Sequence, residues 1–182
     1  MGREAFQEGK QPITAKLNVH GVVVSLVEAN LLRKAGYGEV KEGYLVLTPL
    51  EALYLLDRGR IRVYDSQGKC LSLKELLEYF VSHDRNTWTK YLVYSDLRRR
   101  GYIVKPGFRE RGIEFRVYRK GAEIGKEAAK YLVVGITEGA LLDVAELQNL
   151  TERSRKMGKE LILAVIDRQG EITYYDVSWA TL

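Results

Sequence analysis

Few side chains in this sequence belong to the types that most often carry enzyme chemistry. The chain has one cysteine, Cys70, and two histidines, His20 and His83. A Ser-His-Asp or Cys-His catalytic arrangement needs a histidine beside its nucleophile, and with only two histidines in the chain such an arrangement is disfavoured. A single cysteine also excludes an intramolecular disulfide and a zinc site built from cysteines. Both histidines are interpreted as structural or simply exposed residues.

The tripeptide Glu39-Val40-Lys41 is one candidate for metal-dependent nuclease chemistry. Such a site needs an aspartate upstream of the Glu-x-Lys group, and no aspartate precedes Glu39. The tripeptide also lies beside a turn and is common by chance. A metal-dependent nuclease is therefore the weaker alternative, and no metal-binding residue and no cofactor are predicted.

Positive charge is concentrated in the middle of the chain, although the whole sequence has a net charge of only +5. Between Arg98 and Lys130 there are 11 lysines and arginines against 4 acidic residues, which gives a local net charge of +7. This pattern favours a surface that binds a polyanion, and the alternative is a solvated charged face. If the polyanion is RNA, cleavage without a metal needs a base, an acid and a cation at one phosphate. Tyrosine, histidine and lysine are suitable types.

Length and composition indicate a globular protein. The 182 residues suffice for one ordinary domain or two small ones, with 46% hydrophobic and 29% charged residues. The longest apolar runs, such as residues 131–134 and 161–166, are far shorter than the roughly 20 residues that a membrane crossing needs. The start of the sequence has no apolar run typical of a signal peptide. We therefore expect a cytoplasmic protein without membrane contact.

Helix-capping patterns organise the first half of the chain. A hydroxyl residue followed three positions later by glutamate can form a reciprocal capping box, and this pattern occurs at Ser25, Thr48 and Ser72. It predicts helices near residues 25–35, 49–58 and 73–82, with strands at residues 16–24, 44–47 and 60–63. These elements form a small α+β domain over residues 1–84.

The second half predicts a mixed sheet with helices on its faces. Thr87 can cap a helix that continues to about Arg100 and is closed by Gly101, and a second helix is expected near residues 141–157. Strands are expected at residues 102–105, 112–118, 131–136, 161–166 and 171–177. In the second of these, alternation places Tyr118 on a polar face with Arg116. The predicted domain covers residues 85–182, and its element order does not match a Rossmann fold.

Several spaced segments resemble the archaeal tRNA-splicing endonucleases. They are residues 47–60 (LTPLEALYLLDRGR), 90–105 (KYLVYSDLRRRGYIVK), 115–119 (FRVYR), 129–133 (AKYLV), 159–167 (KELILAVID) and 172–178 (ITYYDVS). Because these segments agree in order over nearly the whole chain, the resemblance is specific. It implies an α/β (α+β) fold with a small N-terminal α+β domain and a nuclease-like, mixed-sheet C-terminal domain.

The resemblance implies a catalytic triad of tyrosine, histidine and lysine. Tyr118 matches the tyrosine and Lys159 matches the lysine, whereas Ala128 stands where the family has its histidine. In the family, the tyrosine is the proposed base for the 2′-OH, the histidine is the general acid, and the lysine stabilises the transition state. The implied reaction cuts precursor tRNA at a bulge–helix–bulge without a cofactor. It leaves 2′,3′-cyclic phosphate and 5′-hydroxyl ends.

The resemblance also implies RNA-binding and assembly residues. The family holds a bulged base between arginines and near an aromatic residue at the chain's end, and the matching positions are Arg153 or Arg155 and Trp179. Asp167 and Glu171 match acidic residues that dock into a partner subunit. The implied partners are precursor tRNA and other subunits of a tetramer, either identical chains or paralogous catalytic and structural chains.

Ala128 leaves two interpretations of the function open. In the first, the chain is an enzyme subunit whose catalytic histidine has been replaced by alanine. In the second, it is a naturally inactive structural subunit that positions a catalytic partner. Retention of Tyr118 and Lys159 favours the first, since a structural chain has no chemical need for either. A non-enzymatic RNA-binding module is a third, less favoured interpretation.

Overall fold

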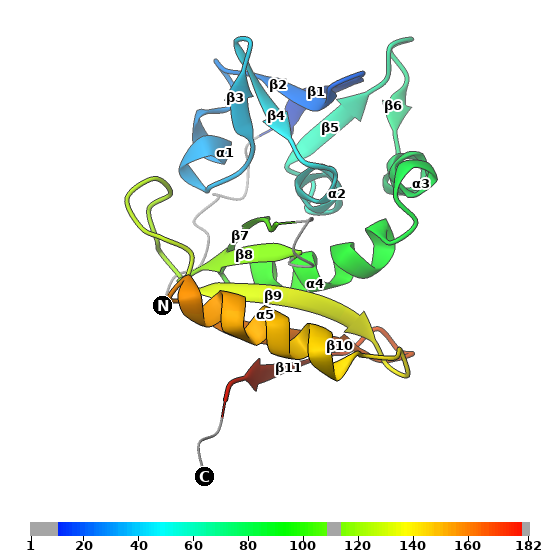
Figure 1. Cartoon of the computed structure of the whole chain (residues 1–182). Coiled ribbons are helices and arrows are strands. Elements are labelled where there is room, and N and C mark those ends of the chain that lie inside the picture. Colours follow the sequence, from blue (N-terminus) through cyan, green and yellow to red (C-terminus); the bar gives the residue numbers. More distant parts are fainter. Residues whose placement is uncertain (1–10, 109–113, 180–182) are drawn as a thin grey trace. The chain divides into compact units, whose positions relative to one another are not determined.

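The structure is a computed structural model that describes residues 11–108 and 114–179. The chain divides into two compact units, one ending at Tyr91 and the other beginning at Leu92. Each unit has its own β-sheet and its own helices (Figure 1). The predicted fold class, a small α+β unit followed by a unit with a mixed sheet, is confirmed.

The sheet of the first unit has the strand order β3-β4-β2-β1-β5-β6. β1 and β5 pair in parallel, and the other neighbouring strands pair antiparallel. Val24, Ala15 and Val63 lie opposite one another across three strands and are fully or almost fully buried. The strands are β1 (Ile13–Asn18), β2 (Gly21–Ser25), β3 (Glu39–Lys41), β4 (Tyr44–Leu47), β5 (Ile61–Tyr64) and β6 (Cys70–Leu71).

The helices described in the first unit are α1 (Asn30–Lys34), α2 (Pro49–Asp57) and α3 (Leu73–His83). The capping boxes predicted at Thr48 and Ser72 are confirmed. In each, the hydroxyl accepts the backbone N–H three positions on, and the glutamate at that position accepts the N–H of the capping residue. Both patterns therefore specify where a helix begins.

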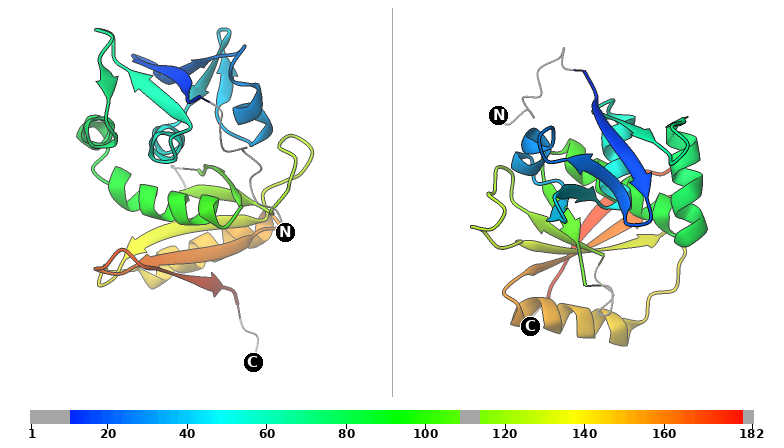
Figure 2. Two further views of the ribbon diagram at one scale, coloured as in Figure 1. Left: turned by 180° about the vertical axis from the view of Figure 1, so that it is seen from behind. Right: turned by 90° about the horizontal axis from the view of Figure 1, so that it is seen from above.

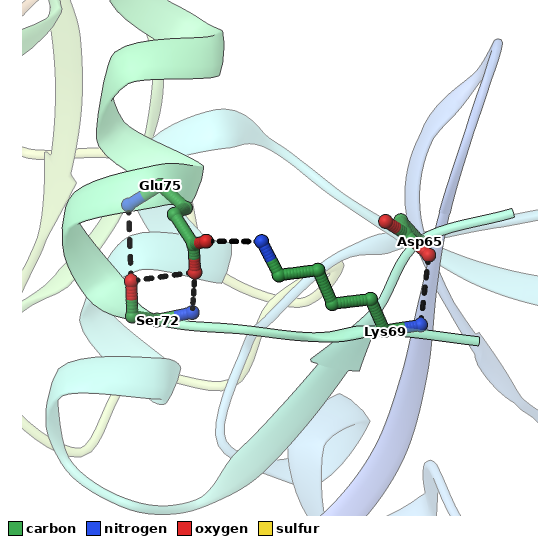
Figure 3. Close-up of polar contacts among 4 residues, drawn as sticks. All are labelled: Asp65, Lys69, Ser72 and Glu75. Carbon is green, nitrogen blue, oxygen red and sulfur yellow. Dashed lines mark hydrogen bonds and ion pairs between the residues drawn. The ribbon is translucent and has the colours of Figure 1, made fainter. Parts of the chain in front are cut away.

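A polar network joins the turn before β6 to the start of α3 (Figure 3). The Asp65 carboxylate accepts the Lys69 N–H at 2.9 Å, and the Lys69 ammonium contacts the Glu75 carboxylate at 2.5 Å. Glu75 also accepts the Ser72 N–H and hydroxyl, both at 2.8 Å. The hydrogen bond from Lys69, followed by those from Ser72, lowers the pKa of Glu75 to about 2. One carboxylate thus caps the helix and holds the turn.

The predicted start of the first helix at Ser25 is wrong. Ser25 is the last residue of β2, where it lies opposite Tyr44, and its carbonyl closes a turn by accepting the N–H of Glu28 and of Ala29. α1 begins only at Asn30 and has no side-chain cap. The single strand predicted over residues 16–24 is also wrong, because β1 and β2 form a hairpin with a turn at residues 19–20.

The sheet of the second unit has the order β11-β10-β9-β8-β7, with β9 and β10 parallel and the other pairs antiparallel. The predicted hairpin between the last two strands is confirmed. Residues 112 and 113 of a predicted strand lie outside the described residues. The elements are α4 (Thr87–Arg99), β7 (Ile103–Pro106), β8 (Phe115–Tyr118), β9 (Tyr131–Thr137), α5 (Val144–Lys156), β10 (Glu160–Ile166) and β11 (Ile172–Val177).

α4 and α5 cover opposite faces of this sheet (Figures 1 and 2). On one face, the Tyr94 ring of α4 lies 6.4 Å from the ring of Phe115 in β8. On the other, Leu150 of α5 packs with Leu132 and Leu161 of the central strands. Burial on both faces explains the nearly continuous apolar sequences of β9 and β10. Within the described residues, no helix combines the length and apolar character needed to span a bilayer.

Candidate active site

The end of β8 and the beginnings of β9 and β10 meet at one end of the second unit's sheet. β8 is antiparallel to β9, with Val117 opposite Tyr131, and β9 is parallel to β10, with Tyr131 opposite Glu160. Residues at the end of β8, just before β9 and just before β10 are therefore neighbours in space. Tyr118 and Lys159 are two of these residues, although they lie far apart in the sequence.

Tyr118 is the last residue of β8 and is buried, with 8% of its surface exposed. It clusters with Ala122 and Ala129, and Ile103 packs against the cluster from β7. Tyr118 shares its face of β8 with Arg116, as alternation predicts, but the tyrosine is buried there rather than being part of a polar surface. The chain after β8 returns with Ala122 and Ala129 beside the tyrosine, an arrangement that strand alternation could not show.

Lys159 precedes β10 and is held from two sides. Its backbone N–H donates to the Ser154 carbonyl at 2.9 Å, which ties it to the end of α5. Its ammonium donates to the Ala129 carbonyl at 2.5 Å. The side chain is half-buried and therefore points along the sheet end toward the start of β9 rather than freely into solvent.

Ala128 is exposed in the loop between β8 and β9, which extends beyond the sheet in Figure 1. Its neighbour Ala129 links the three predicted catalytic positions. Ala129 follows Ala128 in the chain, clusters with Tyr118 and supplies the carbonyl that accepts the Lys159 ammonium. The structure thus brings Tyr118, Ala128 and Lys159 into one small region, and residue 128, the predicted place of the imidazole, is an alanine.

An ion pair and two tyrosines lie beside this region. The Lys130 ammonium contacts the Glu160 carboxylate at 3.0 Å and lies 4.8 Å from the centre of the Tyr131 ring. Tyr131 meets the Tyr102 ring edge to face at 6.2 Å, and the Lys120 ammonium lies 5.1 Å from the centre of the Tyr102 ring. Hydrogen bonding to Glu160, and secondarily to Tyr131, raises the pKa of Lys130. Sequence reasoning missed this group, for which the Lys130-Tyr131 pair at the start of β9 was a signal.

The predicted RNA-binding residues lie toward the same end of the sheet. Arg153 and Arg155 are exposed in the last turns of α5, only a few residues before Lys159. β11 is antiparallel to β10, so its last residue lies opposite the start of β10. Trp179, two residues beyond β11, is 52% exposed. Figure 1 shows β9 beginning, and α5 and β11 ending, on one side of this unit.

Asp167 and Glu171 lie at the other end of the sheet, in the turn between β10 and β11. The Asp167 carboxylate accepts the N–H of Gln169 at 2.9 Å and of Glu171 at 2.8 Å. This turn is therefore ordered by Asp167 and stands apart from the region around Ala129. Glu171 is exposed in this turn, whereas Asp167 is half-buried and its carboxylate is used within the turn.

The residues of the alternative metal site do not form a ligand cluster. Glu39 and Lys41 are both exposed and pair with each other at 3.3 Å. Among the described residues, no group of three or more histidine, cysteine, aspartate or glutamate side chains could hold a metal ion.

The basic stretch between Arg98 and Lys130 is partly paired, since Arg100 contacts Asp96 at 2.7 Å. Arg109 and Arg111 of that stretch lie outside the described residues.

Comparison with known proteins first defines the class. The catalytic C-terminal domain of tRNA intron endonucleases matches residues 87–174, and the N-terminal domain of the same enzymes matches residues 13–77. These two matches cover both compact units. The chain therefore combines a splicing-endonuclease N-terminal domain with the corresponding catalytic-type domain.

Individual relatives identify the family. The chain is 40% identical over 149 residues to a tRNA-splicing endonuclease of Thermococcus kodakarensis, which covers 82% of this chain and 86% of that protein. Identity to the Methanococcus vannielii tRNA-splicing endonuclease is 33% over 174 residues, covering 95% and 97%. For the Thermococcus onnurineus enzyme it is 36% over 172 residues, covering 93% and 98%. This chain belongs to the archaeal tRNA-splicing endonuclease family.

Proposed function

We propose that this chain is a subunit of an endonuclease that cuts precursor tRNA at bulge–helix–bulge intron boundaries in the cytoplasm. Family membership supports the substrate class. The observation that supports the site is the position of Ala129, which lies beside Tyr118 and Ala128 and accepts the Lys159 ammonium. This arrangement supports a site in which three positions that are separated in the sequence act at one phosphate.

The proposed reaction is an internal transfer at that phosphate. The 2′-oxygen attacks phosphorus, the new P–O2′ bond forms, and the P–O5′ bond breaks. Tyr118 takes the proton from the 2′-OH, and the Lys159 ammonium stabilises the negative charge that develops on the phosphate oxygens. The leaving 5′-oxygen needs a proton, which an imidazole at position 128 would supply. The products are 2′,3′-cyclic phosphate and 5′-hydroxyl ends.

Alanine at position 128 cannot give a proton to the leaving oxygen, so the chain lacks the general acid of this scheme. Tyr118 and Lys159 both remain at the sheet end, which favours an enzyme subunit whose histidine has been replaced. Ala128 itself favours a second candidate, a structural subunit that supports a catalytic partner. Since Tyr, His and Lys side chains supply all three functions, the proposed reaction needs no metal and no cofactor.

RNA binding and assembly complete the proposal. Arg153 or Arg155 and Trp179 are exposed toward the same end of the sheet as Lys159, where guanidinium and indole planes suit an unstacked base. Asp167, which is half-buried, and Glu171, which is exposed, lie in a separate turn, and this position suits docking to another subunit. The assembly is proposed to be a tetramer of identical chains or of paralogous catalytic and structural chains.

The test is to replace Ala128→His and to measure cleavage of a bulge–helix–bulge RNA, with paralogous partners supplied if they exist. General acid–base catalysis typically contributes about 10²–10⁴-fold, and a gain of that order is expected. The cuts should fall at the intron boundaries and leave cyclic phosphate ends. A chain that binds the RNA but gains no cleavage would exclude the enzyme interpretation and support the structural subunit.

A further inference from the structure

Lys130 occupies a junction between the elements that carry the proposed catalytic residues. Its backbone N–H donates to the Val117 carbonyl of β8 at 3.0 Å, and its own carbonyl accepts the Glu160 N–H of β10 at 3.1 Å. Its ammonium contacts the Glu160 carboxylate at 3.0 Å. One residue therefore ties the beginning of β9 to both neighbouring strands.

Each of these contacts lies next to a proposed catalytic position. Val117 immediately precedes Tyr118, Glu160 immediately follows Lys159, and Lys130 lies two residues after position 128. The side-chain contact between Lys130 and Glu160 adds to the hydrogen bond from the Lys159 ammonium to the Ala129 carbonyl. Together they fix the beginnings of β9 and β10 against each other at the point where both strands enter the site.

The side-chain pair is too exposed to be explained by global stability alone. The Lys130 and Glu160 side chains are 30% and 45% exposed. Ion pairs in such surroundings contribute little to the free energy of unfolding, because water screens both charges. The Tyr131 ring, 4.8 Å from the Lys130 ammonium, restricts the lysine further. The Lys130–Glu160 pair is therefore better explained by a local role, which is to hold the beginnings of β9 and β10 in place beside the site.

We propose that Lys130 and Glu160 are positioning residues that set the place of the Lys159 ammonium relative to position 128. The inference rests on the proposed function, because it takes Lys159 to be catalytic. It assigns no contact with RNA to Lys130 or Glu160. Their effect passes through Lys159, whose neighbour in the chain is Glu160 and whose carbonyl partner precedes Lys130. Displacing a catalytic group by about 1 Å can cost about 10²-fold in rate, so even a small relaxation of this junction is measurable.

The test removes both side-chain charges at once. The variant K130M/E160Q leaves the net charge unchanged, so the long-range attraction of the protein for RNA is preserved. The matched control is K74M/E78Q, which removes a more exposed ion pair on α3, with a separation of 3.8 Å. Both variants are made in the A128H chain, and single-turnover rate and half-saturating RNA concentration are measured separately.

The expected result for K130M/E160Q is a fall in the maximal rate of about 10–100-fold. The half-saturating RNA concentration should stay within about threefold, because ground-state binding is not removed. K74M/E78Q should change neither quantity. The conservative variant K130R, made in the A128H chain with Glu160 unchanged, should retain most of the maximal rate, since arginine can still pair with Glu160. A higher half-saturating concentration with an unchanged maximal rate would overturn the proposal, because it would make Lys130 a direct RNA contact.

A second readout needs no cleavage and uses the chain with Ala128. The Lys159 ammonium is followed in ¹H–¹⁵N spectra of lysine side chains and is assigned by its loss in K159R. Its signal should shift or broaden in K130M/E160Q and stay in place in K74M/E78Q. An unchanged signal in both variants would overturn the positioning role. If A128H is inactive, the proposed reaction fails, yet this spectrum still decides whether Lys130 and Glu160 place Lys159.

Discussion

Replacing Lys159→Met separates a structural lysine from a catalytic one, because the two roles predict costs of different size. Within the described part of the chain, the Lys159 ammonium donates one hydrogen bond, to the Ala129 carbonyl, and its side chain is half-buried. Water can replace a donor at that exposure. The expected loss in the free energy of unfolding is therefore no more than about 1 kcal/mol, which is below the usual range for hydrogen bonds from charged groups and typical of solvent-screened contacts.

The expected loss in cleavage is larger. Removing one donor that stabilises the charge of a transition state costs about 2.7–4 kcal/mol, or roughly 10²–10³-fold in rate. The assays are urea unfolding of both chains and single-turnover cleavage in the A128H background. K159R is the control, since it keeps a positive charge that can reach the same carbonyl. A variant K159M that unfolds far more easily but cleaves at an unchanged rate would refute the catalytic role.

Three further predictions concern metal, RNA and pH. EDTA should leave cleavage by A128H intact once RNA folding is controlled, whereas loss of activity that a divalent ion restores would point to a carboxylate site. RNA binding by the Ala128 chain should weaken as the salt concentration rises, because binding releases counterions. Replacing Arg153, Arg155 or Trp179 should lower the affinity for bulged RNA more than the affinity for paired RNA, by about 1–3 kcal/mol per stacked base. Equal weakening would leave only generic electrostatics. Because Lys69 and Ser72 lower the pKa of Glu75 to about 2, this carboxylate should stabilise the fold above pH 4.5 and lose that effect as pH falls toward 2. In urea unfolding, the advantage over E75Q should shrink across this window, and a constant difference would contradict the assignment.

Local signals in the sequence predicted the helices well where the cap is itself local. Thr48 and Ser72 each bond to a residue three positions on, so the pattern and the structure coincide. The same pattern at Ser25 failed because that residue belongs to β2 and pairs with Tyr44 across the sheet. A cross-strand partner is not visible in a short window, and it decided the outcome. The short strands β3 and β6 escaped prediction for the same reason.

The site shows the same division between local and distant information. Tyr118, Ala128 and Lys159 followed from a resemblance carried by spaced motifs, and the register of β8, β9 and β10 explains why such distant residues lie together. The burial of Tyr118 depends on Ala122 and Ala129 folding back beside it. The pair between Lys130 and Glu160 requires the parallel register of two strands. Neither could be deduced from alternation within a single strand.

The central claim is that Tyr118, position 128 and Lys159 form one catalytic site, and a comparison of backgrounds tests it most directly. The single-turnover cleavage rate of a bulge–helix–bulge RNA is measured with and without A128H in three chains, the unsubstituted chain, Y118F and K159M. Groups that act together at one phosphate have strongly non-additive effects. The histidine should therefore raise the rate by about 10²–10⁴-fold in the unsubstituted chain and by far less in Y118F and K159M. An equal gain in all three chains would contradict a shared site.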